Sequence, residues 1–362
     1  MITFSEVTKR YPDGTIAVDE LSLEIAASRI TVLVGPSGCG KTTTLRMINR
    51  MVEPSSGTIR LDGEDIGAAD PPALRRRIGY VIQHGGLFPH RTVVDNIATV
   101  PYLLGWDKRR ARGRAMELLE LVGLPAAFAK RYPYQLSGGQ QQRVGVARAL
   151  AADPPVMLMD EPFSAVDPVV RKSLQEELIR LQAELHKTIV FVTHDIDEAI
   201  RLGDRVCVLK VGGRIGQYDT PANLLAAPAD DFVAEFLGED RGLRRLAFLG
   251  SHGLRLVTDG VVADGVVTDG VVTGGVAATG QEWVLVVDAG RRPVGWSLSG
   301  DSDLRPCART FTVGVDSLRS ALDSAALNPS GLAIGVDGDG RVLGVIGQPE
   351  ITRGLRVPAA TP

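Results

Sequence analysis

The segment that most constrains the fold is "GPSGCGKT", residues 35–42. It follows the apolar run "RITVLV" and precedes the helix-like "TTLRMINRM". The segment therefore matches the phosphate-binding pattern G-x-x-x-x-G-K-[ST] in the strand, loop and helix context that the pattern requires. In such a P-loop, backbone N–H groups bind phosphate oxygens, and the N-terminus of the following helix adds partial positive charge. The candidate phosphate-binding residues are Gly35, Pro36, Ser37, Gly38, Cys39, Gly40, Lys41, Thr42 and Thr43.

Individual residues of this loop suggest separate roles. Gly38 and Gly40 lack a Cβ, so their backbone can curl around phosphate oxygens. We expect Lys41 to reach the β- and γ-phosphates and Thr42 to offer its hydroxyl to Mg²⁺. Because Cys39 lies near a helix N-terminus, its thiol pKa is predicted to be lowered.

The second motif is "PVMLMDEP", where the apolar residues 156–159 lead into Asp160 and Glu161. A buried strand that ends in two acids is costly unless something at its end needs them. We expect Asp160 to hold hydrated Mg²⁺ and Glu161 to polarise a water molecule against the γ-phosphate. If the segment stood alone, two solvated acids at a strand end would be the alternative interpretation.

The chain changes in character near residue 240. Over residues 1–240, short apolar runs alternate with helical patterns, which predicts an α/β fold with a mostly parallel sheet covered by helices. Residues 241–362 are rich in Gly, Val and Asp and predict a second domain. That domain contains a five-residue repeat over about residues 257–277. The repeat predicts either short strands and turns or, as its composition favours, a poorly ordered segment.

Composition and charge exclude several classes of protein. The formal net charge of -3 over 362 residues gives no basic footprint for nucleic acid. Three widely spaced cysteines, Cys39, Cys207 and Cys307, suit a reducing compartment better than a disulfide framework. The sequence has no secretory leader and no long uncharged apolar run, so we expect a cytoplasmic chain that does not itself span a membrane.

The segment "LSGGQ", residues 136–140, explains the paired glycines that would otherwise be a poor helix start. Together with the P-loop and the strand that ends in Asp-Glu, it resembles the ATP-binding-cassette (ABC) family over about residues 1–240. The resemblance implies a mixed sheet with a helical subdomain and a head-to-tail homodimer. In that dimer the signature loop of one subunit closes over the γ-phosphate held by the other, and this signature excludes a plain P-loop kinase. The residues implied for this contact are Ser137, Gly138, Gly139 and Gln140.

The same resemblance implies roles at four further positions. Tyr11 matches the aromatic residue that stacks on adenine, and Gln83 matches the glutamine that senses Mg²⁺ and the attacking water. Asp167, in "SAVD", lies in the loop that contacts the opposite subunit, and His194, in "FVTHD", matches the histidine that holds the γ-phosphate. The implied catalytic residues are therefore Glu161, His194 and Gln83, and the implied Mg²⁺ ligands, partly through water, are Thr42, Gln83 and Asp160.

Within the family, "YVIQHGGLFPHRTVVDNIATVPYLLGW" resembles the ATPase subunits of bacterial importers for osmoprotectant quaternary amines such as glycine betaine, choline and carnitine. This implies MgATP as substrate, separate transmembrane permease subunits, an indirectly coupled substrate-binding protein, and a peripheral place at the cytoplasmic face of the cell membrane. Two alternatives stay open. One is an importer ATPase for another small solute, and the other is a soluble ABC protein of translation or DNA repair. Proteins of the latter class commonly carry tandem cassettes or long coiled coils, whereas this sequence has one P-loop and no sustained heptads.

The C-terminal segment "SGLAIGVDGDGRVLGVIGQPEI" predicts a strand, an Asp-Gly turn, a strand and a helix start. It resembles a cystathionine-β-synthase (CBS) regulatory module of the α+β class, and "EWVLVVDAGRRPVGWSLSGDSDL" looks like a degenerate first copy. Some CBS modules bind adenine nucleotides through Thr or Ser with Asp three residues later. The matching pairs here are Leu298 with Asp301 and Gly347 with Glu350, so the resemblance does not extend to nucleotide binding. A generic α+β dimerisation domain is the open alternative.

Overall fold

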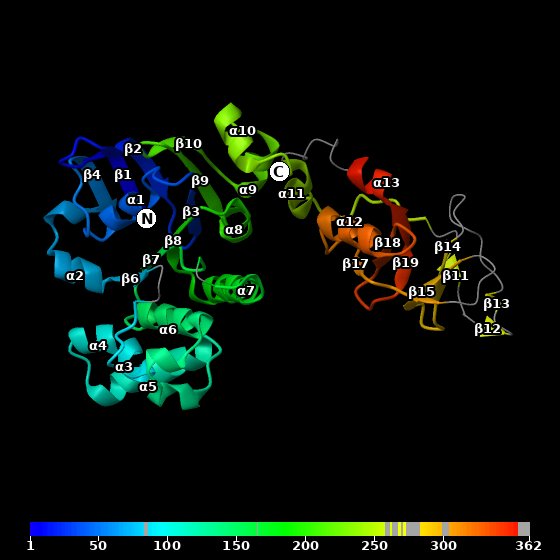
Figure 1. Ribbon diagram of the computed structural model, residues 1–362, viewed down its shortest axis with the longest axis horizontal. Coiled ribbons are helices and arrows are strands. Elements are labelled where there is room, and N and C mark those ends of the chain that lie inside the picture. The colour runs from blue at the N-terminus through cyan, green and yellow to red at the C-terminus, as the bar shows by residue number, and fades with distance from the viewer. Residues whose placement is uncertain are drawn as a thin grey trace. The chain divides into compact units, whose positions relative to one another are not determined.

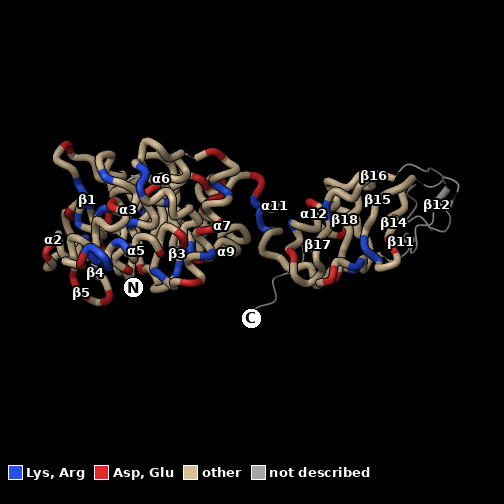
Figure 2. The backbone as a smooth tube through the Cα atoms, turned by 90° about the horizontal axis from the view of Figure 1, so that it is seen from below, with Lys and Arg blue, Asp and Glu red and all other residues tan. Residues whose placement is uncertain are grey.

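The computed structural model describes residues 1–82, 86–164, 166–257, 283–298 and 304–353, and the backbone of three short strands within 261–272. The chain divides into two compact units, Met1–Leu237 and Gly238–Pro362 (Figure 1). Figure 2 shows acidic and basic residues interspersed along both units. Within the described residues, no helix combines the length and the apolar character needed to cross a bilayer.

The first unit is built on a six-stranded sheet with the strand order β10-β9-β3-β8-β7-β6. Its strands are β3 (Ile30–Val34), β6 (Ile78–Val81), β7 (Val156–Asp160), β8 (Thr188–Thr193), β9 (Arg205–Lys210) and β10 (Arg214–Asp219). Five of them pair in parallel, and β10 is antiparallel to β9. The parallel strands are almost wholly apolar because both faces of this sheet are covered. Val32 and Phe191 face one core cluster, while Leu33 and Val190 face the other.

A second sheet of the first unit is antiparallel, with the order β2-β1-β4-β5. It consists of β1 (Ile2–Arg10), β2 (Ile16–Ile25), β4 (Ser56–Leu61) and β5 (Glu64–Asp65). The alternation of apolar runs and helices did not predict this sheet. The mixed arrangement of strands that the family resemblance implies is confirmed.

Helices cover the main sheet and form a separate group at one side of it (Figure 1). The helices of this unit are α1 (Lys41–Ile48), α2 (Pro71–Arg76), α3 (Val93–Ile97), α4 (Thr99–Leu103), α5 (Lys108–Leu121), α6 (Gly138–Leu150), α7 (Pro168–Leu185), α8 (Ile196–Leu202), α9 (Pro221–Ala226) and α10 (Asp231–Leu237), with the 3₁₀ turns η1 (Ile66–Ala68), η2 (Ala126–Lys130) and η3 (Pro133–Gln135). The helical subdomain consists of α3 to α6, which lie together in Figure 1. Its apolar face includes Ala111, Leu118 and Val144, all fully buried.

The described residues of the second unit form three small sheets and four helical elements, of which α12 is the longest. Its elements are α11 (Arg241–Arg245), η4 (Leu246–Phe248), β11 (Val261–Val262), β12 (Val267–Thr268), β13 (Val271–Val272), β14 (Trp283–Val287), β15 (Pro293–Leu298), β16 (Arg305–Pro306), β17 (Thr310–Thr312), α12 (Leu318–Leu327), β18 (Leu332–Val336), β19 (Val342–Gly347) and α13 (Gln348–Arg353). Strand β18 pairs in parallel with β17 and antiparallel with β19.

The predicted strand, turn, strand and helix start near the C-terminus are present as β18, β19 and α13. The Asp337 side chain accepts hydrogen bonds from the backbone N–H groups of Asp339 and Arg341 at 2.9 and 2.8 Å, so the turn is closed by local chemistry. Three two-residue strands, β11 to β13, lie within the valine-rich repeat. The rest of the repeat and Asp301 lie outside the described residues.

Candidate active site

The P-loop connects the end of β3 at Val34 to the start of α1 at Lys41. Gly40 caps the helix in the left-handed region with φ 98°, and Gly38 has φ 78°. A Cβ on Gly40 would lie 2.2 Å from the carbonyl oxygen of Ala17 in β2, whereas a Cβ on Gly38 would meet nothing within 4 Å. Gly40 is therefore required by packing as well as by conformation, and Gly38 by conformation.

Lys41 is enclosed by the loop that precedes it. Its side chain is 6% exposed, and its ammonium donates hydrogen bonds to the carbonyl oxygens of Gly35 at 2.7 Å and Pro36 at 2.9 Å. Within the part of the chain that the structure describes, Lys41 has no carboxylate partner. A buried cation without a counter-charge, next to a helix N-terminus, fits an anionic ligand such as a polyphosphate.

The prediction for Cys39 is wrong. The thiol is fully buried, and burial raises its pKa, an effect that the nearby Lys41 ammonium only partly offsets. The helix N-terminus was expected to lower the pKa, but removal from water disfavours the thiolate more strongly. Cys39 therefore packs the loop against its surroundings.

The end of β7 places Asp160 opposite the P-loop helix. The Thr42 hydroxyl donates to Asp160 Oδ1 at 2.9 Å, and the carboxylate is 6% exposed. A hydroxyl and a carboxylate are the hard oxygen ligands that Mg²⁺ takes from proteins, usually with waters and substrate phosphates completing its shell. The residues present thus fit the predicted ion.

Two residues that sequence reasoning missed also contact Asp160. The Tyr80 hydroxyl donates to Oδ2 at 3.4 Å, and Arg46 Nη2 lies 3.5 Å from the same oxygen. Arg46 lies one helical turn beyond Thr42, a spacing that could have suggested the contact. Tyr80 lies beside Leu158 in the register of β6 and β7, a pairing that the sequence does not reveal.

Glu161 and His194 come together because β7 and β8 are neighbours in the parallel sheet. His194 Nδ1 lies 3.1 Å from Glu161 Oε2, with the side chains 60% and 21% exposed. Glu161 has a positive φ of 44°, which is uncommon for a residue with a side chain. Its backbone N–H donates to the Val192 carbonyl at 3.0 Å. The Glu161 backbone is thus held in a sparsely populated conformation, of the kind that clusters at functional sites.

The signature residues begin α6. Ser137 caps the helix, accepting from the Gln140 backbone N–H at 3.3 Å, while Gln140 Oε1 accepts from the Ser137 N–H at 3.0 Å. A Cβ on Gly139 would lie 2.8 Å from Val170 Cγ1, so this glycine also permits α6 to approach α7. Among the described residues, the signature makes no hydrogen bond to the P-loop of its own chain. Figure 1 shows α6 in the helical subdomain and α1 against the core sheet.

Comparisons with known proteins agree on one family. A profile described as "ABC transporter" matches residues 18–164. Over 241 residues the chain is 57% identical to the choline transport ATP-binding protein OpuBA of Bacillus subtilis (strain 168), and the match covers 67% of this chain and 63% of that protein. Over 248 residues it is 53% identical to the glycine betaine uptake system ATP-binding protein YehX of Escherichia coli (strain K12), covering 68% of this chain and 80% of that protein. The chain belongs to the ABC transporter family.

A solved structure has the same cassette fold over 61% of this chain. The ATP-binding cassette MJ0796, in a dimeric post-hydrolysis state bound to ADP and Pi, matches with a TM-score of 0.56 and 35% identity, covering 61% of this chain and 99% of that one. The family that we predicted from the P-loop, the strand ending in Asp-Glu and the "LSGGQ" segment is thus confirmed.

Two of the three remaining predicted site residues of the cassette lie within the described part of the chain. The Tyr11 hydroxyl lies 3.5 Å from Thr43 Oγ1, so its ring is next to the start of α1. Asp167 caps α7 by accepting from the backbone N–H groups of Val169 and Val170 at 3.1 and 3.0 Å. Gln83 lies outside the described residues.

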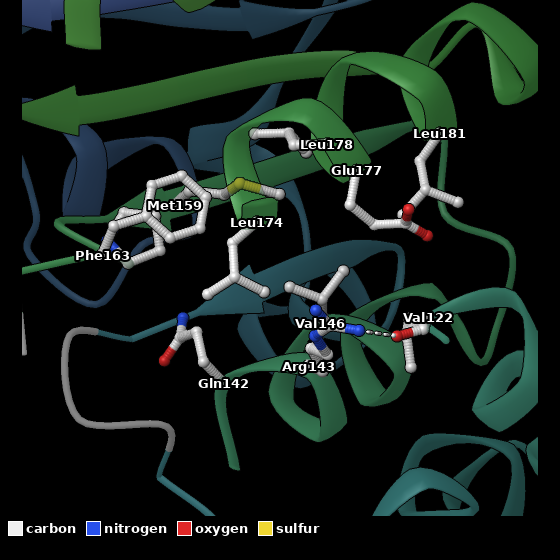
Figure 3. A pocket seen from close by; sticks show the side chains of 11 residues that line it. Val122, Gln142, Arg143, Val146, Met159, Phe163, Leu174, Glu177, Leu178 and Leu181 are labelled. Carbon is white, nitrogen blue, oxygen red and sulfur yellow. Dashed lines mark hydrogen bonds between the residues drawn. The ribbon is translucent and has the colours of Figure 1, made fainter. Parts of the chain in front are cut away.

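A narrow apolar crevice of the cassette separates α6 from α7 (Figure 3). Leu174 points from α7 towards Gln142 and Val146 of α6. Met159 and Phe163, which flank the acids at the end of β7, also line it. The signature helix α6, the helix α7 and the segment that carries Asp160 and Glu161 therefore border one crevice.

Proposed function

We propose that this chain is the ATP-hydrolysing subunit of an importer for osmoprotectant quaternary amines such as choline, glycine betaine and carnitine. The observation that carries the proposal is the meeting of Lys41, Thr42, Asp160, Glu161 and His194 at one end of the parallel sheet. The substrate class is supported by the similarity to OpuBA, a choline transport ATP-binding protein, and YehX, a glycine betaine uptake ATP-binding protein.

The hydrolytic chemistry is divided among these residues. The Lys41 ammonium would bind phosphate oxygens in exchange for the loop carbonyls that it contacts now. Thr42 and Asp160 would hold Mg²⁺, which when bound would neutralise negative charge on the phosphates. Glu161 would take a proton from the attacking water, a contribution worth roughly 10²–10⁴ in rate. His194 holds the Glu161 carboxylate and would itself contact the γ-phosphate.

A homodimer is part of the proposal because, among the described residues, the signature makes no hydrogen bond to the P-loop of its own chain. Ser137, Gly138, Gly139 and Gln140 would act on the nucleotide bound by a second copy, because the partial positive charge at the N-terminus of α6 favours an anionic phosphate. The dimeric state of MJ0796 supports this arrangement. Tyr11 and Asp167 would serve the adenine and the opposite subunit, respectively, and Gln83 would serve the Mg²⁺ and the water.

The permease would dock in a groove beside the helical subdomain. The groove is lined by Arg75, Arg76, Tyr80, Phe88, Val100 and Arg148, among others. Phe88 is 40% exposed, and the groove includes part of the segment from Phe88 to Trp106 that resembles osmoprotectant importers. An exposed aromatic ring beside Arg75 and Arg76 suits an amphipathic helix with acidic residues. This contact would keep the chain at the cytoplasmic face of the membrane and couple it indirectly to a substrate-binding protein.

The second unit would be a CBS-like regulatory module. Its order of β17, α12, β18, β19 and α13 supports this, because one strand pairs in parallel and the next forms a hairpin. We expect a chain stopped at residue 240 to keep ATP hydrolysis, since every described residue assigned to ATP lies at or before His194. It should lose the response of transport to internal salt, measured in reconstituted vesicles. Identical salt dependence of the full and shortened chains would leave the second unit without this role.

The proposal as a whole is tested with Glu161→Gln. This variant keeps the shape of the side chain and loses the base, so it should bind MgATP, stop hydrolysing it, and accumulate as a dimer on a sizing column. Wild-type hydrolysis by Glu161→Gln would contradict the assignment. In vesicles that contain the co-purifying membrane subunits and a binding protein, wild type should drive uptake of radiolabelled choline or glycine betaine. Uptake of another solute instead would favour the alternative importer.

A further inference from the structure

A buried polar cluster joins α7 to the loop that carries His194. Gln175 in α7 donates to Glu198 Oε1 at 3.1 Å, and Thr193 at the end of β8 donates to Glu198 Oε2 at 2.7 Å. The three residues are buried, with exposed fractions of 5%, 2% and 6% in the order Gln175, Thr193 and Glu198. Both carboxylate oxygens of Glu198 are thus occupied by donors from two different elements.

The cluster fixes the backbone on both sides of His194. Thr193 Oγ1 accepts from the Asp195 N–H at 3.0 Å, and Asp195 Oδ1 accepts from the N–H groups of Asp197 at 2.8 Å and Glu198 at 3.3 Å. Thr193, which precedes His194, is held by the Glu198 carboxylate. Asp195, which follows His194, caps α8, the helix that contains Glu198. The imidazole therefore projects from a loop whose two ends are tied to one buried acid.

Arg171 extends the cluster to the loop that precedes α7. Its Nη2 donates to the Val166 carbonyl at 3.2 Å, its Nη1 lies 3.8 Å from Asp195 Oδ2, and its Nε lies 3.9 Å from Glu198 Oε1. Val166 belongs to the "SAVD" segment, which the proposed homodimer presents to the second subunit. A single guanidinium thus spans the partner-facing loop and the loop that holds His194.

If Glu198 served packing alone, an apolar side chain would be energetically more favourable at this buried position. Burial raises the pKa of Glu198, an effect that the Thr193 hydroxyl, Arg171 and Gln175 oppose. A buried ionisable group generally adds less stability than a well-packed apolar residue of the same volume. The presence of Glu198 at this buried position therefore favours a role in fixing the position of the loop that carries His194.

We propose that Glu198, acting with Gln175 and Arg171, is a positioning residue that fixes the place of His194 and ties it to Val166 in the partner-facing "SAVD" segment. The inference rests on the proposed function, because His194 is taken to act on the γ-phosphate in a closed dimer. On the same helix Leu174 and Leu178, each within one turn of Gln175, line the crevice against α6 (Figure 3). One helix therefore contacts both the signature helix and the cluster that places His194.

The test uses the full chain with Glu161→Gln, which holds the ATP-bound dimer for measurement. The readout is the lifetime of that dimer after dilution into ATP-free buffer, together with the affinity of the monomer for MgATP. Adding Glu198→Ala should shorten the lifetime roughly tenfold, in the range of couplings between contacting residues, and leave the monomer affinity unchanged. Adding His194→Ala should have a similar effect, and the two changes together should shorten the lifetime no further than either alone.

Three variants sharpen the result. Glu198→Gln, in place of Glu198→Ala, should give the lifetime of the parent dimer. The oxygen of the new amide can still accept from Thr193, and its NH₂ group can donate to Gln175 once the Gln175 amide has turned over. Glu176→Gln is the matched control. It removes the surface ion pair between Glu176 and Arg201, at 3.0 Å, which joins the same two helices without touching Thr193. The dimer that carries this change should have the same lifetime as the parent dimer. If Glu198→Ala does not fold, Gln175→Leu, which removes one donor and keeps the volume, must shorten the lifetime.

The possible outcomes distinguish a failure of the proposed function from a failure of the inference about Glu198. If Glu161→Gln forms no ATP-dependent dimer, the proposed function itself is wrong. If the dimer forms and neither Glu198→Ala nor Gln175→Leu shortens its lifetime, or if the effects of Glu198→Ala and His194→Ala multiply, Glu198 does not act through His194 and the inference is overturned.

Discussion

Two glycines of the P-loop provide a matched pair that separates backbone conformation from packing. Gly38 and Gly40 both have positive φ, at 78° and 98°. Only Gly40 faces a neighbour, because its Cβ would lie 2.2 Å from the Ala17 carbonyl oxygen, while the Cβ of Gly38 would point into open space. Gly38→Ala therefore tests the conformational strain alone, and Gly40→Ala tests the same strain together with a clash against backbone.

The expected magnitudes follow from these differences. Placing alanine in the left-handed region costs about 1–2 kcal/mol. For a unit of this size each kcal/mol lowers Tm by about 2–4 °C, so Gly38→Ala should lower it by roughly 2–8 °C. Gly40→Ala must also move β2 or the start of α1, which brings the total to about 3–5 kcal/mol and the shift to roughly 6–20 °C.

Calorimetry of the full chain measures both shifts, and the cassette transition is identified as the one that MgATP raises. Gly38→Ala should also weaken MgATP binding more than its small Tm change explains, because its methyl group faces the space that phosphates are proposed to occupy. Equal Tm shifts for the two variants would refute the packing argument for Gly40.

Two further predictions concern the loop and the dimer. Because Cys39 is fully buried and burial raises its pKa, maleimide should leave it unlabelled in the native chain and should label all three cysteines only after unfolding; peptide mapping that finds Cys39 modified first would contradict its placement. Mixing Lys41→Ala chains with Ser137→Arg chains should give heterodimers with one intact and one doubly defective site, and hence MgATP binding at about a quarter of the wild-type number of sites, if chains pair at random. A mixture that binds no better than its separate components would argue against sites shared between chains.

The parts of the site that the sequence predicted are those whose geometry is set by strand order. Asp160, Glu161 and His194 each follow an apolar run, and consecutive parallel strands bring such ends to one edge of the sheet. The Asp337 turn was predictable for a related reason, because its hydrogen bonds join residues at most four apart.

The parts that escaped prediction depend on contacts between distant segments. Tyr80 and Asp160 are 80 residues apart, and Gln175 meets Glu198 across 23 residues. Gly139 was assigned to phosphate approach, but its contact with Val170 shows that packing also excludes a side chain there. The error on Cys39 has the same origin, since a helix N-terminus is visible in the sequence and burial is not.

The side chains that would act in the site also hold one another in place. Lys41 is bound to the carbonyl oxygens of its own loop, Thr42 to Asp160, and His194 to Glu161. A ligand that replaces these contacts exchanges one partner for another, so few side chains have to be ordered when it binds. Because ordering a side chain costs about 0.5–1.5 kcal/mol, such a site retains more of its interaction energy for the ligand. The same reasoning explains why the cluster around Glu198 is buried: a histidine on an exposed loop can act at a fixed place only if the loop itself is anchored from beneath.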